Sequence, residues 1–248
     1  MTIASTPRAR QAVAWLVALA FGALTCTFAG RAYRDLPRPE ALEELSYYPS
    51  GNHLRPATLG HQETVADLAW IRAVQYYGEH RRTDNRFTRM GHVFDILTTL
   101  SPHFLDAYVF GAFALAQEGR DFPAAEALML KGIDANPSSG RLAFELGFLY
   151  YVRPGGREFA SAAEYFEQAA RQADAPPQSA RFAAFARQNS GDLAVALELW
   201  SDVRANTANP ALREMAEREM RRVRWALESG QAGLALHRLA TPRVLLRH

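Results

Sequence analysis

Cysteine is almost absent from this chain of 248 residues, and Cys26 is the only one. A single cysteine excludes an intrachain disulfide and a cluster of thiolate metal ligands. The chain also lacks the H-E-x-x-H zinc motif, the C-x-x-C-H haem-attachment motif, a glycine-rich phosphate loop and a G-x-S-x-G nucleophile turn. Its seven histidines are scattered, with no histidine pair four residues apart. We therefore predict no catalytic residue, no metal site and no cofactor, and a protein that is not an enzyme.

A strong charge of either sign is also lacking, because the formal net charge is only +2. The charges are nevertheless unevenly distributed. Residues 1–34 and 238–248 contain basic side chains and no acidic ones, whereas residues 35–237 contain 21 basic and 26 acidic side chains. A body that binds nucleic acid needs a basic face. This mildly acidic body therefore predicts no nucleic-acid partner.

Charged residues are missing from one long stretch, residues 12–30. As a helix this stretch would span about 28 Å, close to the hydrocarbon thickness of a bilayer. We predict a transmembrane signal anchor at residues 11–31, with a cytoplasmic tail at residues 1–10 and the body on the periplasmic side of the inner membrane. The alternative is a cleaved signal peptide, whose apolar core is shorter, about 7–15 residues.

Proline and glycine divide the rest of the chain into segments. They crowd residues 32–63, which predicts an irregular connector. Apolar residues then recur at helical spacing, and the breaks between them predict four pairs of helices in an all-α fold. The predicted helices are residues 64–77, 86–100, 104–117, 122–135, 141–151, 159–172, 179–188 and 193–205. A helix at residues 211–229 is expected to cap the series, and residues 230–248 are expected to form a basic and apolar tail.

One packing pattern returns through these pairs at nearly constant intervals. Its cleanest copy is Ala162-x3-Phe166-x2-Ala169. Further copies begin 37 residues earlier at Ala125 and 34 residues later at Ala196, and a degraded copy begins at Met90. A fixed period of this length indicates a stack of identical supersecondary units.

The repeated residues resemble tetratricopeptide repeats, whose pattern is W-x2-L-G-x2-Y, then A-x3-F-x2-A, then proline. The third pair contains Leu146, Gly147 and Tyr150 at the matching positions of its first helix. The resemblance covers residues 64–210 and is weakest in the first pair, where Met90 replaces a small residue. It implies an α-solenoid of about four helical hairpins followed by the capping helix.

In tetratricopeptide repeats the first helices of successive pairs line a concave groove. The resemblance transfers this role to nine side chains, which are Gln75, Phe113, Phe144, Phe148, Tyr151, Arg181, Phe185, Gln188 and Asn189. An apolar strip of this kind accepts a partner helix or an extended peptide. The alternative is that the aromatic side chains only pack between repeats, as aromatics at helical spacing usually do.

An anchor joined to a repeat domain predicts a non-catalytic, membrane-anchored scaffold for protein–protein interaction. The expected role is an accessory subunit of a larger membrane or cell-envelope complex. The expected partners are proteins in or near the membrane, and the lipid bilayer contacted through residues 11–31 and the basic tail. The alternative is an assembly or trafficking factor that binds client protein segments transiently.

Overall fold

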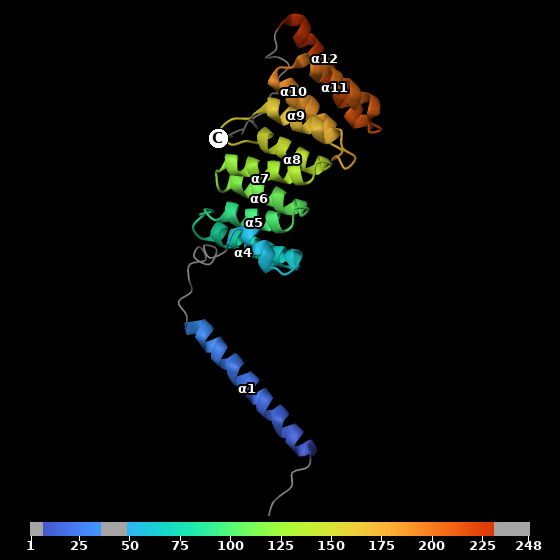
Figure 1. The fold of residues 1–248 in the computed structure, drawn as a ribbon. Coiled ribbons are helices and arrows are strands. Elements are labelled where there is room, and N and C mark those ends of the chain that lie inside the picture. Colours follow the sequence, from blue (N-terminus) through green and yellow to red (C-terminus); the bar gives the residue numbers. More distant parts are fainter. Residues whose placement is uncertain (1–6, 36–48, 231–248) are drawn as a thin grey trace, which may run out of the picture. The chain divides into compact units, whose positions relative to one another are not determined.

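The computed structural model describes residues 7–35 and 49–230, and every regular element in these ranges is a helix (Figure 1). The predicted all-α class is confirmed for this part of the chain. Two compact units divide it, and α1 (Pro7–Asp35) lies in the first. The second unit, called the body below, contains α3 (Gly51–Ala57), α4 (Gln62–Arg82), α5 (Met90–Leu100), α6 (Leu105–Gln117), α7 (Phe122–Ala135), α8 (Gly140–Tyr151), α9 (Phe159–Ala170), α10 (Ser179–Ser190), α11 (Leu193–Asn206) and α12 (Pro210–Ser229).

Helix α1 contains the charge-free stretch for which we predict a transmembrane anchor. Among the described residues, no helix combines the length and the apolar character that crossing a bilayer requires. The predicted anchor at residues 11–31 and the predicted location in the inner membrane are therefore wrong.

Three of the predicted segments extend beyond the described residues. These parts are residues 1–6 of the cytoplasmic tail, residues 36–48 of the connector and residues 231–248 of the basic tail.

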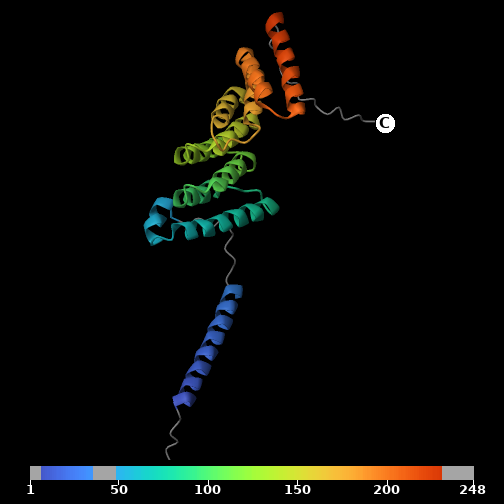
Figure 2. The ribbon, with the colours of Figure 1, turned by 90° about the vertical axis from the view of Figure 1, so that its right-hand side faces the viewer.

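The eight helices predicted as four pairs are all present in the body. The two helices of each pair pack against each other, and successive pairs also pack against each other, as Figures 1 and 2 show for the stacked hairpins. Short polar and glycine signals set the helix ends. Asp121 caps α7 by accepting a hydrogen bond from the backbone N–H of Ala124 at 3.0 Å. Gly191 ends α10 in the left-handed region, at φ 91°.

The turn between α4 and α5 lies later in the chain than the sequence predicts. Helix α4 continues past residue 77 to Arg82, and α5 begins at Met90 instead of residue 86. The hydroxyl of the buried Tyr76 holds this turn, because it donates to the carbonyl of Arg86 at 3.3 Å and accepts from the N–H of Arg89 at 3.2 Å. These contacts leave no trace in the hydrophobic pattern, so the sequence analysis misses them.

The predicted connector at residues 32–63 is partly helical in the described chain. Helix α3 lies inside it, and α4 begins inside it at Gln62. Helix α3 packs on α5 so closely that a Cβ atom added to Gly51 would lie 2.6 Å from the Cβ of Thr99. The connector therefore contributes to the packed body instead of only leading to it.

Close helix crossings give the body its core. Gly111 of α6 faces the ring of Phe94 and the side chain of Leu128, and an added Cβ would meet them at 2.6 and 2.9 Å. A Cβ atom added to Gly147 of α8 would likewise lie 2.9 Å from the ring of Phe166. Small residues on first helices thus let the large side chains of second helices fill the space between pairs, at the density typical of protein interiors.

Helix α12 closes the C-terminal end of the stack as predicted. Its Ala216, Met220 and Val223 are buried in a cluster with Trp200 of α11. Ala226 of the same helix is also buried, whereas the neighbouring Leu227 is 45% exposed. The exposed faces of α12 are mainly polar, with Trp225 also exposed, at 53%.

Candidate functional site

Aromatic side chains from three first helices meet at the surface of the body. The ring of Phe113 in α6 lies 6.0 Å from that of Phe148 in α8, which lies 6.1 Å from that of Phe182 in α10. Tyr151 and Phe144 join from α8, at 5.7 and 5.5 Å from Phe182. We call these five side chains the aromatic stripe. Phe144 is buried, and the other four are partly exposed.

The repeat period produces this arrangement. Phe113, Phe148 and Phe182 follow each other at intervals of 35 and 34 residues, so each occupies a similar place on a successive first helix. Packing beneath them fixes their positions, because the fully buried ring of Phe166 lies 5.2 Å from both Phe144 and Phe182. An ion pair of 2.5 Å between Arg141 and Asp106 joins α8 to α6 beside the stripe.

Two guanidinium groups lie over rings of the stripe. Arg181 lies 5.5 Å from the centre of the Phe182 ring, and Arg157 lies 5.9 Å from the centre of the Tyr151 ring. The negative face of an aromatic ring attracts a cation at such distances. Arg181 is partly buried and Arg157 is exposed, so both groups border the surface on which a partner would rest.

One carboxyl group lies on the same face of α8. Glu145 precedes Phe148 by three residues, which places the two side chains about one helical turn apart. Burial raises the pKa of Glu145, and the charge of Arg141 opposes this rise. The stripe therefore presents both signs of charge at different points.

A shallow pocket continues the stripe toward α4. It has a volume of about 180 Å³ and is lined by Tyr77, Phe110, Phe113, Ala114, Gln117 and Glu118. The rings of Tyr77 and Phe110 lie 5.2 Å apart at nearly right angles. The pocket can accept one apolar side chain of a ligand lying along the stripe.

The predicted groove residues divide into two groups. The structure brings together Phe113, Phe144, Phe148, Tyr151 and Arg181. Gln188 is completely buried and is not part of the surface of the stripe.

The three other predicted residues lie apart from the stripe. Phe185 is directed to the next pair, where it meets Trp200 edge-on at 4.7 Å. Asn189 donates a hydrogen bond of 2.7 Å to the carbonyl of Phe185, within its own helix. Gln75 is exposed on α4.

Sequence reasoning misses Phe182 and Glu145. The predicted register selects Phe185 in α10, three residues beyond the ring that completes the stripe. The interval of 34 residues from Phe148 points to Phe182 and is the signal that could have found it. Glu145 gives no comparable signal, since acidic side chains on helices are usually solvated.

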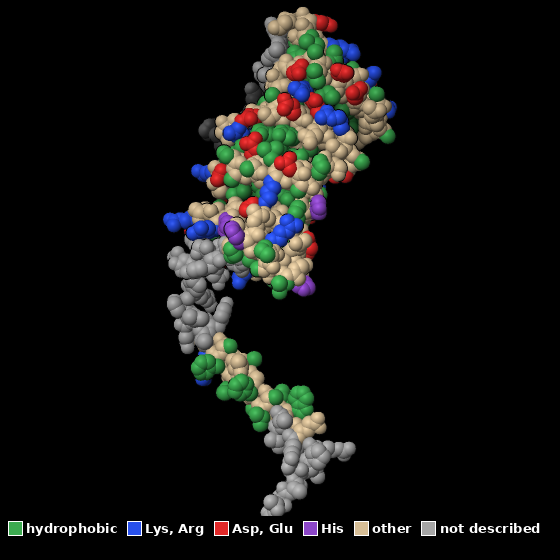
Figure 3. Space-filling model, viewed as in Figure 1, with side chains coloured by type: hydrophobic (Ala, Val, Ile, Leu, Met, Phe, Trp, Pro, Cys, Tyr) green, Lys and Arg blue, Asp and Glu red, His purple; other side chains and the backbone are tan. Residues whose placement is uncertain are grey.

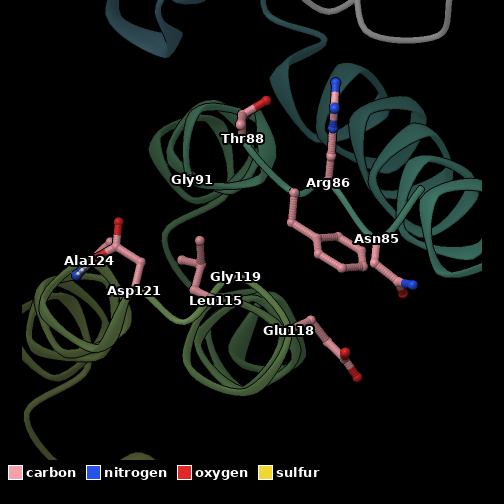
Figure 4. A pocket seen from close by; sticks show the side chains of 10 residues that line it. Asn85, Arg86, Thr88, Gly91, Leu115, Glu118, Gly119, Asp121 and Ala124 are labelled. Atoms are coloured by element: carbon pink, nitrogen blue, oxygen red, sulfur yellow. Dashed lines mark hydrogen bonds between the residues drawn. The ribbon is translucent and has the colours of Figure 1, made fainter.

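A larger pocket, of about 490 Å³, lies between the turn before α5 and the turn between α6 and α7. Figure 4 shows Arg86 and Glu118 extending in opposite directions from it. Its acidic side chains are already engaged, because Asp121 caps α7 and Glu118 pairs with Arg81. This pocket therefore offers fewer available groups to a ligand than the stripe does.

On the face of the body in Figure 3, acidic and basic side chains are interspersed. In the described ranges, no three His, Cys, Asp or Glu side chains gather closely enough to hold a metal ion. No known protein family, curated protein or solved structure matches the chain.

Proposed function

We propose that the body is a helical-repeat scaffold of the tetratricopeptide type, which binds a segment of a partner protein on the aromatic stripe. The observation that carries this proposal is the continuous contact of Phe113, Phe148 and Phe182 across three helices, with each ring partly exposed. Aromatic side chains offer a large contact area at a low cost in conformational entropy. The packed hairpins fix their spacing before a ligand arrives, which lowers the cost of binding.

The exposed area of the aromatic stripe limits the stability of a complex formed on it. An aromatic side chain buries about 150–250 Å², so four mostly buried ones present roughly 300 Å² or less. A stable interface buries about 800 Å² on each partner. The stripe alone therefore favours the exchangeable binding of client segments by an assembly or trafficking factor.

The role of an accessory subunit requires further contact area. Helix α4 offers some, because Leu68, Ile71 and Val74 on its outer face are 59, 50 and 40% exposed. A partner that covers both α4 and the stripe would bury enough apolar surface for a lasting complex. The two roles therefore differ in whether α4 is covered as well.

Quantitative affinity enrichment tests the proposed surface. The tagged full chain is compared with Phe148→Ser and Phe182→Ser on the stripe, and with Leu130→Ser, which is 37% exposed on α7. Circular dichroism first confirms that all variants are equally helical. We expect the two stripe variants to lose the same partner about tenfold or more, as for a residue at the centre of an interface, while Leu130→Ser retains it. Equal recovery by all four proteins would contradict the proposal.

The same comparison separates the two roles. We expect Leu68→Ser on α4 to leave the binding of a transient client unchanged. A loss with Leu68→Ser equal to that of the stripe variants would instead indicate an accessory subunit held over both surfaces.

A further inference from the structure

The two arginines over the stripe differ from the arginines around them. Arg141, Arg153 and Arg187 pair with Asp106, Glu158 and Glu167. Within residues 49–230, Arg157 and Arg181 have no ion pair and no hydrogen bond, and their recorded contacts are with the rings of Tyr151 and Phe182. Among the described residues, two cations on the aromatic stripe are thus without anionic partners.

These two cations lie over neighbouring rings of the stripe. The rings that they cover, Tyr151 and Phe182, are 5.7 Å apart. Arg181 comes from the first turn of α10, and Arg157 comes from the loop before α9. Two different elements therefore place a guanidinium group beside the same pair of rings. A guanidinium group presents a planar fork of donors that fits a carboxylate, so each can take one carboxylate without leaving its ring.

A carboxyl group on α8, the middle helix of the stripe, has the opposite sign. Glu145 has no hydrogen-bond or ion-pair partner among the described residues. It lies beside Phe148, on the side away from Tyr151 along α8. A carboxylate of a ligand would be repelled there and attracted near Arg157 and Arg181, so the charges favour carboxylates beside the rings of Tyr151 and Phe182.

We propose that the partner segment is acidic and apolar, with its carboxylates on Arg157 and Arg181 and its apolar side chains on Phe148 and Phe113. This inference rests on the proposed function of the stripe and adds the chemistry of its ligand. The charge complementarity is local, because the acidic balance of residues 35–237 would disfavour an acidic partner elsewhere on the body. The shallow pocket beside Phe113 receives the apolar side chain farthest from the two arginines.

A random-peptide display library panned on the full chain tests this chemistry directly. We expect the selected peptides to combine Asp or Glu with Leu or aromatic residues. We also expect the acidic residues to disappear from peptides selected on the double variant Arg157→Gln, Arg181→Gln. The matched control is Arg204→Gln, which removes an exposed arginine from α11 and should leave the selection unchanged. Selection of basic or uncharged peptides by the unaltered chain would overturn the inference.

Fluorescence anisotropy with the best selected peptide then gives the size of the effect. Replacing its acidic residues by Gln should weaken binding about tenfold at low salt, as two partly exposed ion pairs would, and raising the salt concentration should reduce this difference. Glu145→Gln should strengthen binding of the acidic peptide by about twofold, because it removes a repulsion. Equal affinity of the acidic and Gln peptides would overturn the inference.

The variants of the aromatic stripe separate two outcomes. In one the inferred acidic ligand is wrong, and in the other the stripe is not a binding surface at all. If the Gln peptide binds as tightly as the acidic one and Phe182→Ser still abolishes binding, the stripe is a binding surface and the inferred charge preference is wrong. If Phe182→Ser leaves binding unchanged, the stripe is not the binding surface and both proposals fail.

Discussion

Four polar side chains form a connected network inside the C-terminal part of the body. The indole N–H of the buried Trp200 donates to Gln188 at 2.8 Å, and the amide of Gln188 donates to Glu219 at 3.0 Å. Arg222 donates to both carboxylate oxygens of Glu219, at 2.9 and 2.7 Å. Gln188 is 0% exposed and Glu219 is 6% exposed. Buried polar groups tolerate such burial only when their hydrogen bonds are made, so Gln188 is the central link.

Replacing Gln188 by Ala should lower the free energy of unfolding by about 2–4 kcal/mol, because Trp200 and Glu219 each lose a partner in a dry environment. Asn189→Ala, the neighbouring position with one hydrogen bond inside its own helix, should cost about 1 kcal/mol or less. Urea denaturation of the two variants measures the difference. A similar decrease in the free energy of unfolding for both variants would show that the hydrogen-bond network contributes little to stability.

A second polar contact should make stability depend on pH. The hydrogen bond from His80 and that from the N–H of Arg86 hold the pKa of Asp84 below its ordinary value of 3.8. A carboxyl group whose pKa is lowered by folding stabilises the fold at pH values above its pKa in the unfolded chain. This contribution is lost as the pH falls through its pKa in the folded protein. Asp84→Asn should therefore be less stable than the unaltered chain at pH 7.

The difference in free energy of unfolding between Asp84→Asn and the unaltered chain should decrease below about pH 4. In that range the carboxyl group of Asp84 begins to protonate in the unfolded chain. Urea denaturation at pH 7 and at pH 3 measures this difference. The control is Asp202→Asn, an exposed position on α11. If the difference in free energy of unfolding between Asp84→Asn and the unaltered chain is the same at pH 7 and at pH 3, protonation of Asp84 does not contribute to the pH dependence of stability.

Helix pairs in this body depend on glycine where two helices cross. Gly111→Ala would place a Cβ atom 2.6 Å from the Phe94 ring and 2.9 Å from Leu128. Overpacking of this kind costs about 1–3 kcal/mol. Gly78→Ala is the matched change, since it also lies inside a helix and its Cβ would meet nothing within 4 Å.

We expect Gly78→Ala to raise the free energy of unfolding by about 0.5–1 kcal/mol, the helix propensity of Ala over Gly, and Gly111→Ala to lower it. Thermal unfolding followed by circular dichroism compares them. Stabilisation by both substitutions would mean that α5 and α6 are not in close contact at Gly111.

Most of the helices can be predicted from the sequence, because the positions of proline and glycine and the spacing of apolar residues indicate the same helix ends. Helix α7 is predicted without error, since Asp121 caps its start and Asn136-Pro137 ends it. The end of α4 is missed, because it depends on the side-chain hydrogen bonds of Tyr76. Helix α3 is missed because it carries Pro56 and is only seven residues long. Its contact with α5 stabilises it, and such a contact cannot be inferred from local sequence.

Across the body, stacking turns a local repeat into a surface. The sequence places Phe113 and Phe148 on neighbouring helices correctly, because both follow the repeat register. It fails at α10, where Phe182 faces the stripe and Phe185 faces Trp200. That choice depends on how α10 is rotated against α9 and α11, which the spacing alone does not determine. The anchor prediction fails for a different reason, because freedom from charge is only one of the requirements for spanning a bilayer.

Site-specific photocrosslinking in living cells tests the central claim, that the aromatic stripe holds a partner segment. A benzophenone amino acid is placed at Phe113, on the stripe, or at Leu130, on α7, and the adducts are identified by mass spectrometry. The account predicts that position 113 crosslinks to one protein, through a segment rich in acidic and apolar residues, and that position 130 does not. Equal crosslinking at both positions, or none at position 113, would contradict it.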